Sequence, residues 1–455
     1  MWTYSVSEVA SIVDGTVVGD GAVTVSGVFT DSRADGSEML FVALRGENFD
    51  GHRFVSDAAQ KGAKAALVTE PVAVSSLAQI VVCDTLQALT RLATHHRRRF
   101  NLKVAAITGS AGKTTTRTLL SGILGVSKKV HEPEKNFNNH IGVPLTMMKL
   151  DRSYDAAVFE LGCSDFNEIG PLTKIVSPHV ALITNVGPAH LEKLKNLEGV
   201  ARAKGELFDE LDADAIAIVN LDDPHISKMH TCAENRVTFS TGGASSDVML
   251  LDRTPGPFGQ SLTMKLNDTR MDVAFPLPGF HNAIDATAAA AAALAMGASL
   301  DDIKTGLASA KTRPGRFEIH DKNGVCVIDD TYNANPSSVA ASLEVLAEMV
   351  PAAQRMAVLG DMLELGVNTL DAHRQIGRIA ARLGLKKLFL FGAFADATKQ
   401  GAVAEGMDAL KIECSDNVLE IAKKVVEISK SGDALLIKGS RGMKLERVVC
   451  AILEG

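Results

Sequence analysis

Glycine, lysine and threonine residues that could bind a phosphate group follow an apolar segment in the first third of the chain. Residues 104–108 predict a buried strand, and the residues after them are Gly109, Ser110, Ala111, Gly112, Lys113, Thr114 and Thr115. Glycines allow successive backbone N–H groups to point at one anion, and the positive N-terminal end of a following helix adds to the attraction. Lys113 would reach the outer phosphates of a nucleotide, and the Thr114 hydroxyl would bind Mg²⁺. The segment therefore predicts a nucleotide-phosphate site, although the general signature has a glycine where this chain has Ile107.

Two further candidate ligands come after predicted strands. Glu160 ends the apolar run that begins at Ala156, and His190 follows the strand 180–184. Because open α/β sheets bind ligands at the carboxyl ends of their strands, we expect both side chains to face the phosphate site, where they could hold a metal ion. Each alone would more often be a structural residue, but the two together favour a metal role. Composition gives no reason to single out Lys204, which falls on a predicted helix with a charged face.

Asparagine side chains mark two more candidate sites. Residues 136–146 hold Asn138 and Asn139 among four hydrogen-bonding side chains, together with a glycine and a proline, and predict a binding loop. Asn282 precedes an alanine-rich helix. Its amide could cap that helix or pair with a purine edge, and the residues alone favour the cap.

The last third of the chain begins after a predicted hinge at residues 311–316. Strands and helices alternate beyond it, with no glycine-rich dinucleotide fingerprint. Polar residues follow the predicted strands, and the candidates among them are Asp330, Asn333, Asn335, Ser440 and Arg441.

The beginning of the chain mixes short strand-like runs with turns. Asp31, Ser32, Arg33 and Arg45 lie on those predicted turns. Polar turns are usually solvated loops, so a ligand role for these four residues is one of two alternatives.

The length of 455 residues and the alternation of strand and helix patterns predict an α/β protein of three domains. They are a small α/β domain (1–84), a central P-loop ATPase-like domain with a doubly wound parallel sheet (85–313), and a Rossmann-like domain (314–455).

Composition excludes several classes of protein. The net charge of -7 argues against a nucleic-acid-binding surface. The six cysteines form no C-x-x-C pair, which fits reduced thiols better than disulfides or a zinc site. The first residues lack the pattern of a signal peptide, and no apolar run is long enough to cross a bilayer. We therefore expect a cytoplasmic protein without membrane insertion.

The string from Ile107 to Thr116 resembles the ATP loop of the Mur ligases, the amide-forming enzymes of peptidoglycan precursor synthesis. That family's loop also departs from the general signature at its first glycine. The resemblance continues along the chain in the family's order, through residues 136–146, Glu160, His190, Lys204, His281, Asn282, residues 313–316 and Asp330.

The resemblance implies roles around a metal site. Lys113 and Thr114 would bind the β- and γ-phosphates of ATP and Mg²⁺, and Glu160 and His190 would serve two Mg²⁺ ions. Lys204 resembles the family's carbamylated lysine, in which added CO₂ turns a cation into an anion that can support Mg²⁺.

The resemblance also implies contacts with the rest of the nucleotide. Asn282 would contact adenine, and Arg313 or Arg316 would close over ATP together with Asp330. The chain departs from the family in one place, because Asp285 stands where related sequences often have an asparagine.

Four segments resemble one member of the family, the ATP-dependent ligase that joins D-alanyl-D-alanine to UDP-N-acetylmuramoyl-tripeptide through an acyl phosphate. They are residues 40–46, 329–336, 359–366 and 438–441. The resemblance implies a monomer in which Asn333 and Asn335 bind the dipeptide. The other candidate substrate contacts are Asp31, Ser32, Arg33 and Arg45 for the UDP-sugar end, and Asn138, Asn139, Ser440 and Arg441.

Three alternatives stay open. Another Mur-type ligase would differ only in the amino acid or peptide it adds. A phosphate-loop NTPase or small-molecule kinase would turn over ATP without an amine, but it would leave the two flanking domains unexplained. A non-catalytic nucleotide-binding module would leave Glu160, His190 and Lys204 without a task.

Overall fold

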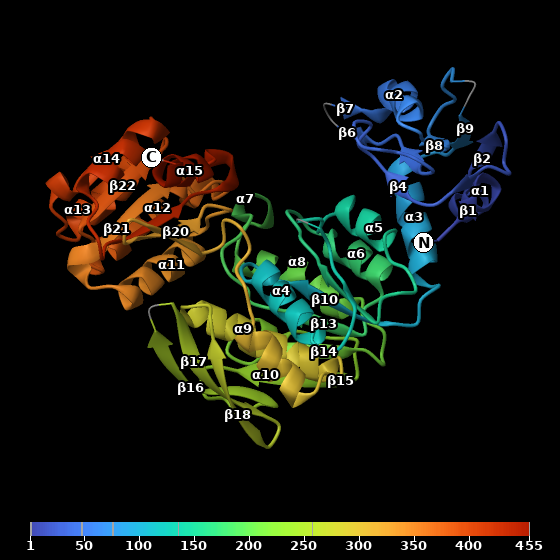
Figure 1. Cartoon of the computed structure of the whole chain (residues 1–455). Helices are drawn as coiled ribbons and strands as arrows, with labels where there is room; N and C mark the ends of the chain where they lie inside the picture. Colours follow the sequence, from blue (N-terminus) through green and yellow to red (C-terminus); the bar gives the residue numbers. More distant parts are fainter. Residues whose placement is uncertain (1, 47–48, 75–76, 135, 257, 455) are drawn as a thin grey trace.

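The computed structural model describes residues 2–46, 49–74, 77–134, 136–256 and 258–454. These residues form three α/β parts in chain order, each built around its own sheet. The first and last parts lie apart, on either side of the central part (Figure 1).

The first part is a five-stranded sheet in the order β2-β9-β8-β5-β4, parallel except for β2 at the edge. Two short antiparallel pairs, β1 with β3 and β6 with β7, lie outside that sheet. The elements are β1 (Tyr4–Ser5), α1 (Val6–Val13), β2 (Thr16–Val18), β3 (Thr24–Val25), β4 (Val28–Phe29), β5 (Leu40–Val42), β6 (Arg45–Gly46), β7 (Phe49–Asp50), η1 (Gly51–Phe54), α2 (Val55–Gln60), β8 (Ala65–Val68) and β9 (Ala78–Val81).

Helix α3 (Thr85–Arg97) joins the first part to the central part. The Asp84 side chain caps it by accepting hydrogen bonds from two backbone N–H groups of the first turn, at 2.8 and 3.0 Å. Leu89 on the buried face belongs to the same apolar cluster as Val9 of α1 and Met147 of α5 (Gly142–Met147). The two parts therefore share one hydrophobic core.

The central part is a nine-stranded sheet in the order β11-β12-β10-β13-β14-β15-β16-β17-β18, of which β11 to β16 are parallel. Apolar side chains of α5, α6 and α8 pack in one buried cluster, and those of α4, α9 and α10 pack in another. The elements are β10 (Lys103–Thr108), α4 (Lys113–Leu124), β11 (Val130–His131), α5 (Gly142–Met147), β12 (Ala156–Glu160), α6 (Ile169–Val176), β13 (Val180–Ile183), α7 (Leu191–Leu194), α8 (Leu197–Asp209), β14 (Ile216–Asn220), η2 (Ile226–Lys228), β15 (Asn235–Ser240), β16 (Val248–Gly256), β17 (Gly259–Leu266), β18 (Thr269–Phe275), α9 (Phe280–Ala295) and α10 (Leu300–Ala308).

Strands β16, β17 and β18 form an antiparallel extension that the sequence analysis did not predict. Buried and exposed residues alternate along β18, as they do when one face of a strand is packed and the other is solvated. Leu262, Met264 and Val273 from the packed face join the cluster under α9 and α10. The extension therefore widens the sheet on the side of the alanine-rich helix.

The last part is a six-stranded sheet in the order β19-β20-β24-β21-β22-β23, parallel except for β19 at the edge. The elements are β19 (Glu318–Lys322), β20 (Val325–Asp330), α11 (Pro336–Met349), η3 (Ala352–Gln354), β21 (Arg355–Gly360), η4 (Gly366–Asn368), α12 (Thr369–Arg382), β22 (Lys387–Phe391), α13 (Ala395–Ala404), η5 (Ala409–Lys411), β23 (Ile412–Cys414), α14 (Val418–Ile428), β24 (Ala434–Lys438), η6 (Arg441–Met443) and α15 (Glu446–Glu454).

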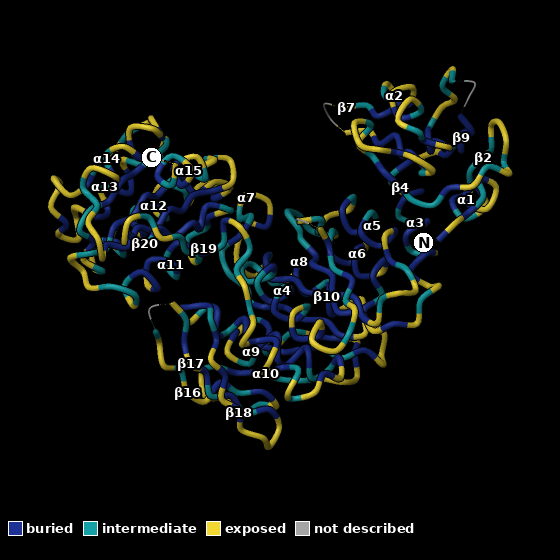
Figure 2. The backbone as a smooth tube through the Cα atoms, in the orientation of Figure 1, coloured by how far each residue is buried: buried dark blue, intermediate teal, exposed yellow. Residues whose placement is uncertain are grey.

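Burial is concentrated in the sheets of all three parts, while the exposed residues lie in the connecting loops and on the outer faces of helices and edge strands (Figure 2). The predicted α/β fold of three domains with parallel sheets is confirmed. Across the described ranges, no helix is both long and apolar enough to cross a membrane.

Candidate functional site

The predicted phosphate loop connects β10 to α4. Gly109 has φ +151° and Gly112 has φ +77°, which are conformations that L side chains rarely adopt. A Cβ atom on Gly109 would lie 1.8 Å from Thr184 Oγ1, and one on Gly112 would lie 2.2 Å from Asp285 Oδ1. Glycine is therefore required at both positions, by backbone conformation and by close packing.

The end of β13 holds this loop in place. The Ala111 backbone N–H donates a hydrogen bond to Asn185 Oδ1 at 3.0 Å, and Ser110 Oγ donates one to the Gly187 carbonyl at 2.9 Å. Lys113 Nζ donates to the Gly109 carbonyl at 2.7 Å, so the lysine lies folded over the loop. Its ammonium group is thus at the place where the loop would meet a phosphate.

A buried carboxylate faces the start of α4. Thr114 Oγ1 donates to Glu160 Oε2 at 2.8 Å, and Asn138 Nδ2 donates to Glu160 Oε1 at 2.9 Å. Burial raises the pKa of Glu160, but the charges of Lys113 and Arg117 and the two hydrogen bonds outweigh this effect and hold the pKa below its ordinary value. An ionised carboxylate beside a hydroxyl is a donor set that suits Mg²⁺.

Lys204 lies inside the same region, on α8, with only 2% of its surface exposed. Its Nζ is 3.9 Å from Cys163 Sγ. Burial, with a smaller contribution from the charge of Lys113, lowers the pKa of Lys204 to about 8. A partly neutral, buried amine is the form that can react with CO₂, so the surroundings of Lys204 suit carbamylation.

His190 precedes α7 and faces the last part of the chain. Its Nδ1 lies 2.8 Å from Glu364 Oε2. Burial lowers the pKa of His190, and the charges of Lys113 and Lys204 lower it further, whereas Glu364 opposes them. His190 is therefore near both lysines, but the carboxylate that it contacts is Glu364 of the last part and not Glu160.

A pocket of about 330 Å³, open mouth included, lies beside the loop. Its lining residues come from α4, from the start of α9 and from the hinge, and they are Thr114, Thr115, Thr118, Leu119, Leu277, Asn282, Lys311, Thr312, Arg313 and Arg316. The pocket joins the phosphate loop to three of the residues predicted to contact the nucleotide, namely Asn282, Arg313 and Arg316.

The predicted helix cap at Asn282 is wrong. Helix α9 begins at Phe280 after Gly279, with no side-chain hydrogen bond at its cap. Asn282 Nδ2 instead donates to the Pro278 carbonyl at 2.7 Å, which holds the amide at the wall of the pocket. The residues alone could not place the first turn of the helix this accurately.

Both hinge arginines are already held by protein groups. Arg313 donates to Thr118 Oγ1 at 2.8 Å and to Glu132 Oε1 at 3.0 Å. The guanidinium of Arg316 lies 4.1 Å from the centre of the Tyr332 ring.

The predicted residues of the last part have structural partners. Asp330 Oδ2 accepts hydrogen bonds from Lys438 Nζ at 2.7 Å and from Ser342 Oγ at 2.6 Å. The Asn333 carbonyl also accepts one from Lys438 Nζ, at 3.0 Å. Asn335 caps α11.

The remaining two candidates of the last part differ in burial. Ser440 Oγ accepts from the Leu363 N–H at 2.9 Å and donates to the Ala334 carbonyl at 3.2 Å. Arg441 is exposed and pairs with Glu446 at 3.5 Å.

The candidates for the UDP-sugar end lie in the first part, away from the phosphate loop. Asp31 and Arg33 form an exposed ion pair at 2.8 Å, with Ser32 between them in the chain. Arg45 pairs with Asp50 at 3.2 Å and with Glu70 at 3.0 Å. Asn139, by contrast, is in the central part, where its Oδ1 accepts the Gly142 N–H at 2.8 Å and shapes the loop before α5.

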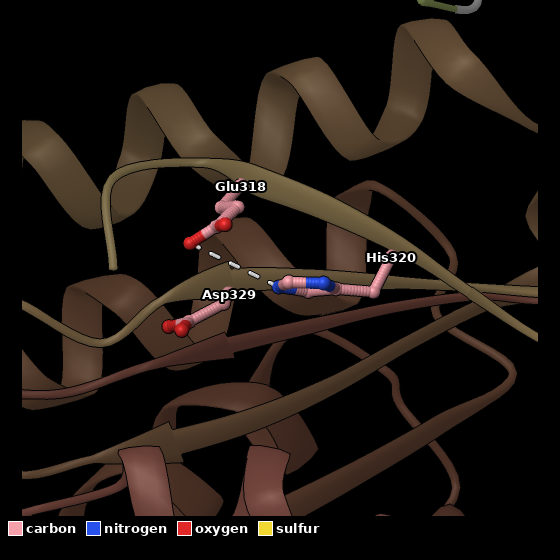
Figure 3. Close-up of side chains that lie close together, drawn as sticks. All are labelled: Glu318, His320 and Asp329. Carbon is pink, nitrogen blue, oxygen red and sulfur yellow. Dashed lines mark ion pairs between the residues drawn. The ribbon is translucent and has the colours of Figure 1, made fainter. Parts of the chain in front are cut away.

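Among the His, Cys, Asp and Glu side chains of the described ranges, one group of three lies close enough to share a metal ion, and it includes none of the predicted metal residues Thr114, Glu160, His190 and Lys204. Glu318, His320 and Asp329 lie on the β19–β20 hairpin with one ligand atom each within 4.8 Å of the others (Figure 3). Glu318 and Asp329 are register partners, and His320 is two residues along the same strand, so all three share one face. Asp329 Oδ1 accepts hydrogen bonds from the Thr331 N–H at 3.0 Å and from the Thr331 hydroxyl at 2.6 Å. These bonds give Asp329 a structural role in the turn after β20.

Four residues contact the predicted site residues but were not themselves predicted, namely Arg117, Glu132, Asn185 and Cys163. No spacing rule connects them, because their partners are far away in the chain. Of these four residues, Asn185 could most readily have been predicted from the sequence, because it lies in the polar segment directly after a predicted strand.

The fold and the site define a three-domain α/β protein whose P-loop faces a carboxylate from the neighbouring strand. Family models match nearly the whole chain, with the Mur ligase family, catalytic domain at residues 24–97, the Mur ligase middle domain at 107–293 and the Mur ligase, glutamate ligase domain at 315–441. The chain belongs to the Mur ligase family.

Full-length relatives agree with the family models. The chain is 37% identical to the UDP-N-acetylmuramoyl-tripeptide–D-alanyl-D-alanine ligase of Escherichia coli, over 100% of this chain and 99% of that protein. A crystal structure of MurF from Acinetobacter baumannii has a TM-score of 0.93, 32% identity and full coverage of both chains. A MurF ligase from Thermotoga maritima in complex with ADP has a TM-score of 0.84 and 29% identity, covering 94% of this chain and 97% of that one.

Proposed function

We propose that the chain is an ATP-dependent ligase that joins D-alanyl-D-alanine to UDP-N-acetylmuramoyl-tripeptide. The products are UDP-N-acetylmuramoyl-pentapeptide, ADP and phosphate. The observation that carries the proposal is the end-to-end similarity to ligases of that name, which covers all three parts of the chain. A simple NTPase or kinase would need only the central part.

In the first step, a carboxylate oxygen of the tripeptide attacks the γ-phosphorus of ATP. The bond between that phosphorus and the bridging oxygen breaks, ADP leaves, and an acyl phosphate remains. Catalysis is mainly positioning and neutralisation of charge. Lys113 at the loop, with Arg313 and Arg316 at the pocket wall, supplies positive charge for that purpose.

In the second step, the amine of D-alanyl-D-alanine attacks the acyl carbon. The amide bond forms, inorganic phosphate leaves, and the amine gives up a proton. The acyl phosphate would hydrolyse in open water, so the last domain closes over the site while it exists.

Two Mg²⁺ ions would be held by Thr114, Glu160, His190 and Lys204. The Thr114–Glu160 contact supports the first site, because it brings two oxygen donors to the phosphate loop. The ions supply positive charge that offsets the negative charge of the phosphates. Carbamylation of Lys204 would replace a cation by an anion at a position close to the positive charge of Lys113.

The domains divide the substrates among them. Residues 1–84 bind the UDP-sugar end, where Arg33 and Arg45 are exposed cations suited to a diphosphate. Residues 85–313 bind ATP and the tripeptide carboxylate, and residues 314–455 bind the dipeptide through Asn333 and Asn335. The protein acts as a monomer in the cytoplasm, where its nucleotide-linked substrates are made.

The test is phosphate release from ATP by the purified chain with Mg²⁺ and UDP-N-acetylmuramoyl-tripeptide. The amine is D-alanyl-D-alanine, D-alanine or nothing. We expect strong release only with the dipeptide, together with a UDP-pentapeptide detected by mass. Equal release in all three arms would refute the ligase and favour an NTPase, and release with another amine would favour a different Mur-type ligase.

A further inference from the structure

A fully buried arginine lies behind the predicted metal carboxylate. The Arg117 side chain, on α4, has no exposed surface. Its Nη1 is 3.9 Å from Glu160 Oε2, and its Nε is 3.7 Å from Glu132 Oε2. A buried guanidinium requires negative partners, so the charge of Arg117 is divided between two carboxylates, only one of which belongs to the site.

Glu132 has a second partner in the hinge. Its other oxygen accepts a hydrogen bond from Arg313 at 3.0 Å, and Arg313 also donates to Thr118 on the same helix as Arg117. In this position Arg313 lines the nucleotide pocket. Glu132 and Thr118 together therefore hold a hinge side chain against α4 and at the pocket wall.

These contacts form a row of alternating charges from the hinge to the metal carboxylate, namely Arg313, Glu132, Arg117 and Glu160. We propose that Glu132 is a positioning residue, which fixes Arg313 at the nucleotide pocket and, by sharing Arg117, leaves the charge of Glu160 available to the metal. Glu132 belongs neither to the phosphate loop nor to the residues that line the nucleotide pocket, so it acts through its two arginine partners.

The substitution Glu132→Gln removes the charge but keeps the shape. Arg313 then loses its ionic anchor, so we expect nucleotide affinity to fall five- to tenfold. Arg117 then pairs more strongly with Glu160 and competes with a metal ion for that carboxylate. We therefore expect Mn²⁺, used as a probe for Mg²⁺, to bind several-fold more weakly. Glu132→Asp keeps the charge and should recover part of both affinities.

Direct binding measurements test this inference without requiring ligase activity. Only the kinetic test of the inference rests on the proposed function. Nucleotide affinity is measured with a fluorescent ADP analogue, and Mn²⁺ affinity by electron paramagnetic resonance, on the full chain. If the ligase assay succeeds, E132Q should raise KM for ATP with kcat changed less than about twofold. The control is E134Q, two residues beyond Glu132 in the chain, which removes an exposed carboxylate that pairs with Lys149.

E132Q leaves Arg117 with less negative charge nearby and can weaken folding, so its thermal melting is recorded first. The double variant E132Q/R117M removes one charge of each sign. We expect it to regain Mn²⁺ affinity, because Glu160 has lost its competitor, but not nucleotide affinity, because Arg313 stays unanchored. Wild-type affinities in folded E132Q, or recovery of both affinities in the double variant, would overturn the proposal.

Discussion

At the scale of single residues, Lys204 has unusual surroundings for a lysine. Its amine is buried, its hydrogen-bond partner is a thiol, and the charge of Lys113 is close by. With its pKa lowered to about 8, a larger fraction of the Lys204 amine is neutral at pH 7 than for an exposed lysine. The neutral amine can attack CO₂ and lose a proton, which gives a carbamate.

Carbamylation of Lys204 predicts that activity depends on CO₂. Removing dissolved CO₂ should lower ligase activity several-fold, and added bicarbonate should restore it. A carbamate resonance should appear by NMR in ¹³C-bicarbonate near pH 8 and be missing from Lys204→Arg, which keeps the positive charge. A wild-type protein with neither the resonance nor the CO₂ dependence would contradict the assignment.

At the scale of secondary-structure elements, close contact between α4 and α9 positions the phosphate loop. The alanine-rich face of α9 allows the two helices to approach, and Asp285 on α9 meets Gly112 just before α4 begins. Burial raises the pKa of Asp285 to about 8. The carboxyl group is therefore mostly protonated in the folded protein at pH 7.

This buried acid predicts an effect of pH on stability. Between pH 4 and 8 the Asp285 carboxyl ionises in the unfolded chain but stays protonated in the fold, so the free energy of unfolding falls as pH rises. Asp285→Asn removes that loss and should stabilise the central part at pH 7, by about 4 kcal/mol at most. Thermal melting between pH 5 and 8 measures it, with the exposed Asp301→Asn as control. The same pH dependence in D285N as in the wild type would refute it.

At the scale of the whole molecule, two ion pairs among the described residues join the last part to the central part. Arg253 on β16 forms a two-pronged ion pair with Glu348 on α11 and lies near the Phe280 ring. His190 pairs with Glu364 on the other side of the hinge. The unpredicted antiparallel extension thus helps to place the last domain relative to the central one.

Loss of the Arg253 contact predicts looser domains. Arg253→Met keeps much of the side-chain volume but removes a partly buried ion pair worth about 1 kcal/mol. A loss of that size changes the equilibrium between domain arrangements several-fold. Small-angle X-ray scattering without substrates should show a larger radius of gyration for R253M than for the wild type. Lys265→Met, which removes an exposed pair on the neighbouring strand, is the matched control. Identical scattering from R253M and wild type would show that the pair does not hold the domains.

The sequence alone determined the fold class, the three domains and the family, because each depends on local patterns. The phosphate loop is contiguous from Gly109 to Thr115, and parallel strands bring their carboxyl ends together wherever a polar residue such as Glu160 follows an apolar run. The predicted fold and family are confirmed. The roles of the site residues stay predictions.

Only the tertiary structure decided which side chains share a charge. Arg117, Glu132 and Arg313 come from α4, a strand end and the hinge, and no sequence pattern relates positions so far apart. The same is true of Asp285, whose protonation depends on burial against a glycine of another segment. Local spacing specifies which chemistry is available in the chain, whereas burial and long-range contacts set the ionisation and position of each group, because both depend on neighbours brought together only by folding.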